Sequence, residues 1–220
     1  MGAYTDTDML GLVRVRDRPG SERVNNHEAE NSEGHAPMIT RSANRRDAAE
    51  IARLHIESWR ATYVNDLPPD FLAEQDLAGR TARWEARFAE GVHVLLAEDA
   101  GALVGFVAFG PAHDPESFEA GDWEIHNIHV DPARHGQGIG RALFERAVCA
   151  SREHGASGVM LWVVRTNRNA RDFYEHMGML NDGGEQEHTV QPGISLHEVR
   201  YRLPLAPVKG SPVKGSPVKG

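Results

Sequence analysis

Gly136, Gly138 and Gly140 follow a run typical of a strand at residues 125–130, and a segment with helical spacing, residues 139–150, begins within the glycines. Glycine lets the backbone turn tightly and come close to a ligand. A loop of this kind leaves several backbone N–H groups unpaired at the positive end of a helix dipole, where they can bind phosphate. The spacing therefore predicts a strand, a phosphate-binding loop and a helix, in that order.

Two common phosphate-binding patterns do not describe this loop. The dinucleotide pattern G-x-G-x-x-G fails because Arg141 occupies the third glycine position, and the P-loop pattern fails because no Gly-Lys-Ser/Thr follows. A second segment, residues 167–178, is NRNARDFYEHMG and fits the pattern N-x-x-A-x-x-F-Y-x-x-x-G. Together the two segments resemble the signatures of the GCN5-related N-acetyltransferases (GNAT), in the order which that family has. The resemblance extends over about residues 38–203.

The resemblance implies that acetyl-CoA is the acyl donor. Its diphosphate would be bound by backbone N–H groups of Gly136, Gln137, Gly138, Ile139, Gly140 and Arg141. The end of the preceding strand, Ile128, His129 and Val130, would bond the amides of the pantetheine arm as if the arm were another strand. Asn167 matches the family asparagine that bonds the same arm, although its position also suits a helix N-cap. His135 is also expected among the cofactor-binding residues. It stands where the family usually has Arg or Gln, so we expect it to lend less positive charge and the affinity to be modestly weaker.

Tyr174 is the expected general acid. Ala170, Phe173 and Met177 share one helix face and should be core, whereas Tyr174 is rotated about 100° from Phe173 and can point toward a cleft. A phenol with a pKa near 10 can protonate a departing thiolate. Without the motif, an ordinary half-buried tyrosine would be the favoured interpretation, and the resemblance changes this preference.

The acceptor amine needs a base, because deprotonating a lysine-like amine with a pKa of about 10.4 at pH 7 costs about 4–5 kcal/mol. Glu124 is the leading candidate, since family members often have a catalytic glutamate on this strand that acts through water. His126 is the second candidate, because it shares the strand face of Glu124 and has a suitable unperturbed pKa. Another group, or no dedicated base, also stays open.

Other reactive side chains support weaker hypotheses. His126, His129 and His135 suggest a metal site, but residues three apart on a strand face opposite sides, and we expect no metal. Cys149, the only cysteine, lies off the apolar stripe of its helix and has no base at a suitable spacing. We therefore expect direct attack of the amine on the thioester and no acyl-cysteine.

Trp59 and Tyr63 are four residues apart and share a helix face. Packing in the core is the first interpretation. In the family, the first two helices line the acceptor pocket, so the resemblance implies that these aromatic residues shape the substrate site. An acidic loop at residues 111–121 could attract a cationic acceptor, although a solvated loop is the default.

Around these residues the sequence predicts about seven strands and four helices. The strands are expected at residues 38–42, 92–98, 103–110, 125–130, 158–164, 180–189 and 195–203, and the helices at residues 47–63, 70–90, 139–154 and 167–177. The resemblance implies a mixed, mostly antiparallel α/β sheet. Its central and fifth strands would splay apart to admit the pantetheine arm.

The composition fits one soluble globular domain with tails. The chain has 220 residues, of which 40% are hydrophobic and 25% charged, and no apolar run approaches the ~20 residues that span a bilayer. We expect residues 1–37 to be a disordered extension, 38–204 the N-acetyltransferase domain, and 205–220 a flexible tail with a PVKGS repeat. The single cysteine suits a cytoplasmic location. The net charge of −8 disfavours nucleic acid and mildly favours a cationic partner, with solubility as the simpler explanation, and a homodimer stays open.

The sequence thus predicts an N-acetyltransferase that moves an acetyl group from acetyl-CoA to a primary amine of a small molecule or peptide, in a ternary complex. The rival hypothesis is a catalytically silent CoA-binding or regulatory module on the same fold. A third is a nucleotide-binding protein that uses the glycine loop alone. The amine itself is not predicted, because acceptor pockets are built from variable helices and loops.

Overall fold

The computed structural model describes residues 38–112 and 121–206. The expected N-terminal extension, the acidic residues 113–120 and the repeat tail from residue 207 lie outside the described residues. Among the described helices, none is both long and apolar enough to cross a membrane.

The described residues form one seven-stranded sheet in the order β1-β2-β3-β4-β5-β7-β6. Its strands are β1 (Ile39–Ser42), β2 (His93–Asp99), β3 (Ala102–Pro111), β4 (Asp122–Val130), β5 (Gly158–Val164), β6 (Leu180–Gln191) and β7 (Ile194–Pro204). Strands β4 and β5 are parallel, and every other neighbouring pair is antiparallel. The predicted mixed, mostly antiparallel sheet is therefore confirmed.

The described part of the chain has five α-helices, one more than expected. They are α1 (Ala48–Thr62), α2 (Pro69–Ala73), α3 (Leu77–Ala89), α4 (Ile139–Glu153) and α5 (Arg168–His176), with short 3-10 helices at Arg45–Asp47 and Pro132–Arg134. The single helix expected at residues 70–90 was wrong. Asp76 accepts hydrogen bonds from the backbone N–H groups of Ala78 and Gly79 and so begins a new helix after α2.

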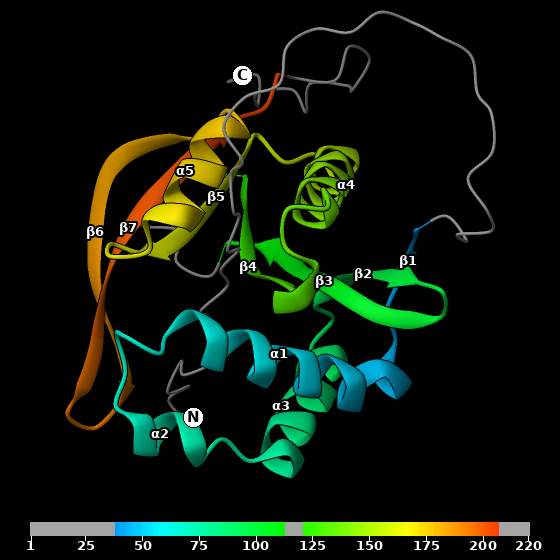
Figure 1. The fold of residues 1–220 in the computed structure, drawn as a ribbon. Coiled ribbons are helices and arrows are strands. Elements are labelled where there is room, and N and C mark those ends of the chain that lie inside the picture. The colour runs from blue at the N-terminus through cyan, green and yellow to red at the C-terminus, as the bar shows by residue number, and fades with distance from the viewer. Residues whose placement is uncertain (1–37, 113–120, 207–220) are drawn as a thin grey trace, which may run out of the picture.

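The helices cover both faces of the sheet, with α1 and α3 together on one side and α4 on the other (Figure 1). On the first side, Ile51 and Leu54 of α1 and Trp84 of α3 pack on Leu96 and Phe106 of the sheet. On the other side, α4 and α5 meet through their aromatic rings, with Phe144 and Phe173 6.2 Å apart. This packing fixes α4, and with it the glycine loop that precedes it.

Gly105 of β3 allows α4 to approach the sheet closely. A Cβ atom at this position would lie 2.9 Å from Ile139 Cγ2, 3.0 Å from Leu143 Cδ1 and 3.1 Å from the His129 carbonyl oxygen. We expect Gly105→Ala to lower the free energy of unfolding by about 1–3 kcal/mol, because a tightly packed interface must move to admit the methyl group. Denaturant unfolding measures the loss. Ala102→Val, at the exposed start of the same strand, is the control and should change stability little.

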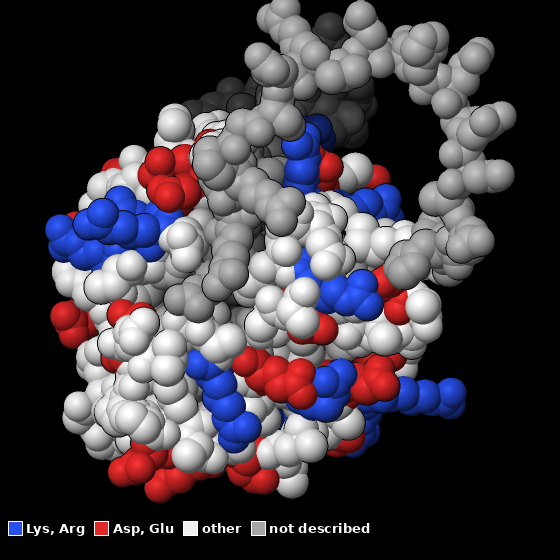
Figure 2. All heavy atoms as spheres, in the orientation of Figure 1, with Lys and Arg blue, Asp and Glu red and all other residues white. Residues whose placement is uncertain are grey.

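The visible surface carries both signs of charge. Arg side chains are interspersed with Asp and Glu over the face shown in Figure 2. Arg53 and Glu57 pair along α1 at 2.8 Å, and Arg45 pairs with Glu85 at 2.9 Å. Exposed pairs of this kind contribute little to stability, so the buried contacts of the site decide its geometry.

Candidate active site

Strands β4 and β5 are joined at one end and part at the other. Their parallel register covers three pairs, from Asp122 opposite Gly158 to Glu124 opposite Met160. At the joined end, the buried Asp122 carboxylate accepts hydrogen bonds from Arg202 of β7 at 2.6 Å and from the Ser157 hydroxyl at 2.9 Å. Beyond Glu124 the two strands no longer pair. The predicted splay is therefore present, and Glu124 lies where it begins.

The edge of β4 that faces this gap offers backbone groups for hydrogen bonding. Asp131 donates its N–H to the carbonyl of Val104 in β3. Bonded pairs alternate in an antiparallel ladder, so His129, opposite Phe106, also directs its backbone groups to β3. Ile128 and Val130 then direct theirs away from β3 and toward β5. Two of the three residues predicted for cofactor binding thus lie on the open edge, while the backbone of His129 does not.

The glycine loop follows directly at the end of this edge. Gly136 and Gly138 have φ angles of 78° and 80°, in the left-handed region that glycine adopts readily. Gly138 is the N-cap of α4, and within the described residues no side chain caps this helix, whereas Asp76 caps α3 and Asn167 caps α5. In this part of the chain the first N–H groups of α4 therefore have no side-chain acceptor, as an anion site requires. These groups belong to Ile139, Gly140 and Arg141.

Charged and polar side chains around the loop already have partners. Arg134 pairs with Asp99 at 2.7 Å, and Arg141 pairs with Glu145 at 2.8 Å. The Asn167 side-chain oxygen accepts a hydrogen bond from the N–H of Ala170, so the N-cap expectation is confirmed. The Gln137 side chain is exposed, so the group of this residue that could bind the diphosphate is its backbone N–H.

A β-bulge brings the two candidate bases together. Ala108 of β3 pairs with Asn127 of β4, and its neighbour Phe109 pairs with Ile125, which leaves His126 as the extra residue. Bulges re-aim side chains and are common beside active sites. Here His126 Nδ1 lies 3.6 Å from Glu124 Oε2, and both side chains are at most 4% exposed. The expectation that they share a side is confirmed, although the bulge produces the contact.

Buried polar contacts hold the bulged strand against α1 and α3. The Asn127 side-chain oxygen accepts a hydrogen bond from Arg87 at 2.7 Å. His129 Nδ1 lies 3.0 Å from the Ser58 hydroxyl, and the His129 ring is 4.5 Å from that of His55. Burial, and secondarily the charge of His129, lowers the pKa of His55 well below its usual value, so this imidazole stays neutral at physiological pH. His129 therefore has a structural contact to α1 rather than a place in the gap.

Tyr174 is buried in the hydrophobic core, in contrast to the expected position facing an open cleft. Its ring lies 5.3 Å from Phe173, 6.4 Å from Phe144 of α4 and 6.3 Å from Tyr201 of β7. Burial alone raises the pKa of the phenol above its usual value, and no hydrogen bond to the hydroxyl contributes. The hydroxyl is therefore protonated at physiological pH and can donate a proton or a hydrogen bond.

Trp59 and Tyr63 are 1% and 0% exposed, with ring centroids 5.3 Å apart. Core packing is thus confirmed for both. Within the described part of the chain, however, the indole Nε1 of Trp59 and the hydroxyl of Tyr63 are buried without a hydrogen-bond partner. Such groups carry a free-energy cost unless a ligand or water satisfies them. They stay candidates for binding the acceptor.

Glu198 of β7 is a further buried acid that the sequence interpretation missed. It is 2% exposed, lies opposite Val164 of β5 and accepts a hydrogen bond from Gln186 at 2.8 Å. Burial and, after it, the charge of Glu198 raise the pKa of Tyr63 well above its usual value. The signal was available, because Glu198 is in phase with the apolar Leu196 along a strand.

Comparison with known families assigns residues 50–179 to the acetyltransferase (GNAT) family. The chain belongs to the GNAT family. The uncharacterized N-acetyltransferase YuaI of Bacillus subtilis (strain 168) is 34% identical over 131 residues, which are 59% of this chain and 74% of that protein. The L-amino acid N-acyltransferase MnaT of Escherichia coli (strain K12) is 28% identical over 146 residues, 65% of this chain and 80% of that protein. This GNAT protein is accordingly an acyltransferase.

Solved GNAT structures share its fold. The PaiA N-acetyltransferase of Thermoplasma acidophilum, in complex with coenzyme A, aligns with a TM-score of 0.60 at 16% identity, over 77% of this chain and all (100%) of that one. YncA of Salmonella typhimurium, with its cofactor acetyl-CoA, aligns with a TM-score of 0.60 at 23% identity, over 82% and 100%.

The family match ends at Met179, before β6 and β7. The glycine loop, Glu124 and Tyr174 lie inside the matched region of this GNAT protein, and Glu198 lies outside it. The residues that the last two strands add to the site are therefore not specified by the family match.

Proposed function

We propose that this GNAT protein transfers the acetyl group of acetyl-CoA to a primary amine by direct attack within a ternary complex. One observation carries the proposal: the open edge of β4 runs from Glu124, where β4 and β5 part, to a glycine loop with uncapped helix N–H groups. An extended arm with amide groups suits such an edge, as strand addition does in peptide recognition. A diphosphate suits the loop. The solved neighbours with coenzyme A and acetyl-CoA support the same donor.

Glu124 and His126, where the gap opens, and the buried Tyr174 suit acetyl transfer. Acetyl-CoA supplies the activated acetyl thioester. Glu124, with His126 beside it, would take a proton from the acceptor ammonium, directly or through water, and the neutral amine would then attack the thioester carbon. Once the carbon–nitrogen bond has formed, Tyr174 would give its hydroxyl proton to the sulfur as the carbon–sulfur bond breaks, and the tyrosinate would regain a proton from the nitrogen that becomes the amide.

The acceptor side of the gap suits a cationic amine. Glu124 and Glu198 are buried acids on β4 and β7, and the unpartnered groups of Trp59 and Tyr63 lie on α1 and in the residue that follows it. Relatives that act on amino acids, such as MnaT, support a small amine as the acceptor. The proposal is tested by incubating the protein with acetyl-CoA and a panel of amines and measuring the free thiol of coenzyme A that is released. Binding of coenzyme A without turnover of any amine would favour a silent CoA-binding module.

Gly138→Ala tests the cofactor loop. Gly138 and Gly155 flank α4 at opposite ends with φ of 80° and 84°, and a Cβ atom at either would meet nothing within 4 Å. The left-handed backbone should cost each alanine variant about 1–2 kcal/mol of stability. The strain lies beside the N–H donors only at Gly138. We therefore expect Gly138→Ala to bind coenzyme A about tenfold more weakly than the wild type does. Calorimetric titration measures this, with Gly155→Ala as the matched control, and equal affinities for the two variants would contradict the loop assignment.

A further inference from the structure

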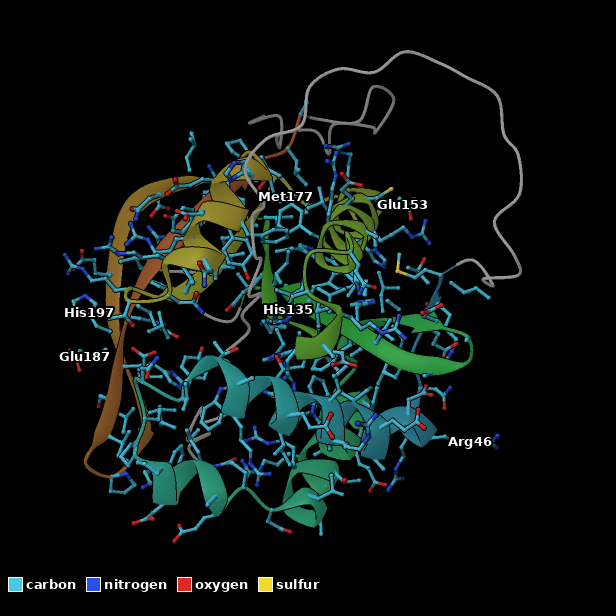
Figure 3. The ribbon with its side chains drawn as sticks, in the orientation of Figure 1. Arg46, His135, Glu153, Met177, Glu187 and His197 are labelled. Carbon is cyan, nitrogen blue, oxygen red and sulfur yellow. The ribbon has the colours of Figure 1, made fainter. Side chains whose placement is uncertain are left out.

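His135 contacts the backbone at the end of the open edge. It follows the 3-10 helix Pro132–Arg134 in an extended conformation, with φ of −61° and ψ of 148°. Its side chain turns back so that Nε2 lies 3.2 Å from the carbonyl oxygen of Val130. Figure 3 labels His135 between the end of β4 and the start of α4. A carbonyl oxygen only accepts, so Nε2 carries a proton and donates it to this bond.

The same carbonyl belongs to the edge that the pantetheine arm needs. The ladder alternation turns Val130 away from β3. Its carbonyl is one of the acceptors available to an amide N–H that approaches along the gap. The His135 ring donates to it from the loop that follows the strand, and so it occupies an acceptor that the arm would use.

We propose that His135 competes with the pantetheine arm for the Val130 carbonyl and thereby lowers the affinity of this protein for coenzyme A. This inference rests on the proposed function, because it concerns the same edge. It differs from the sequence expectation, in which His135 stood among the groups that bind the cofactor. Displacement of the ring offsets part of the binding free energy of the arm, and the ring is available to retake the carbonyl when the product leaves.

Calorimetric titration of His135→Ala with three ligands tests the proposal. The ligands are coenzyme A, pantetheine, which lacks the nucleotide, and 3′-phospho-ADP, which lacks the arm. We expect coenzyme A and pantetheine to bind to His135→Ala about 3- to 10-fold more tightly than to the wild type, the range that one net hydrogen bond provides. The affinity for 3′-phospho-ADP should be unchanged. His135→Ser provides a second truncation and should give the same pattern.

His176→Ala is the matched control. His176 also bonds a backbone carbonyl, that of Asp172 at 2.6 Å, but both residues belong to α5 and not to β4 or the glycine loop. Its removal should leave the affinities for all three ligands unchanged. If both His135 variants bound coenzyme A and 3′-phospho-ADP more weakly, the ring would serve the phosphates. If their affinities were unchanged, the ring would affect neither the pantetheine arm nor the nucleotide. Either result overturns the inference. A wild type that binds no coenzyme A would instead overturn the proposed function itself.

Discussion

Glu124→Gln should reduce kcat/KM for acetyl transfer about 100- to 1,000-fold, the range expected when a general base is removed. The side chain is buried where β4 and β5 part, 3.6 Å from His126. Glutamine has nearly the same shape but cannot take a proton from the acceptor ammonium to produce the attacking amine. The dissociation constant for coenzyme A should stay within about twofold, because the loop and the outer end of β4 are untouched.

The pH profile provides the sharper readout. In the wild type, kcat/KM should fall on the acidic side as the base is protonated, and this limb should be lost in Glu124→Gln. Glu187→Gln, on the exposed face of the edge strand β6 (Figure 3), is the control and should retain wild-type kinetics. Wild-type turnover by Glu124→Gln would contradict the assignment. If His126→Gln lost more activity than Glu124→Gln, the histidine would be the base.

The fold was predictable where the signals are local. Strand β5 was expected at residues 158–164 and has these bounds, because a short apolar run stands between Gly155 and the polar residues from Arg165 onward. The helix expected at residues 139–154 matches α4 within one residue. The break between α2 and α3 was missed because no proline or glycine marks it. It depends on the Asp76 side chain, which accepts hydrogen bonds from the first N–H groups of α3.

The site was predictable only where it depends on motifs. The glycine loop was found from its spacing, whereas Asn167 and Tyr174 were found from the resemblance of residues 167–178 to a family motif. The bulge at His126 was not, because it depends on the register between β3 and β4, which alternation along one strand cannot reveal. The contact between His135 and the Val130 carbonyl depends in the same way on how the loop folds back.

Tyr174 shows how far a helical phase can mislead. A 100° rotation from Phe173 correctly separates the two side chains, but it does not say what lies in the second direction. In the structure, Tyr201 of β7 and Phe144 of α4, which also contacts Phe173, bury the ring. The role expected from the motif therefore depends on a hydroxyl within the core, and this can be tested directly.

Tyr174→Phe should lower kcat about 100-fold, with little change in coenzyme A affinity, because the departing thiolate loses its proton donor. Stability should be unchanged or slightly higher, since the hydroxyl is buried and no hydrogen bond contributes to its raised pKa. Because burial raises that pKa, ionisation of Tyr174 should not limit the wild-type rate near neutral pH. Steady-state kinetics and denaturant unfolding measure both effects on the same protein.

Tyr201→Phe is the matched control, because it removes the hydroxyl of the neighbouring ring. The Tyr201 hydroxyl donates to Glu175 at 2.6 Å and accepts from Arg171 at 3.2 Å. Its loss should cost about 1–2 kcal/mol of stability and leave kcat within about threefold of wild type. The two variants thus make opposite changes: one should lose rate without stability, and the other stability without rate. A Tyr174→Phe variant that turns over at the wild-type rate would remove the proton donor from the mechanism and leave the tyrosine a core residue.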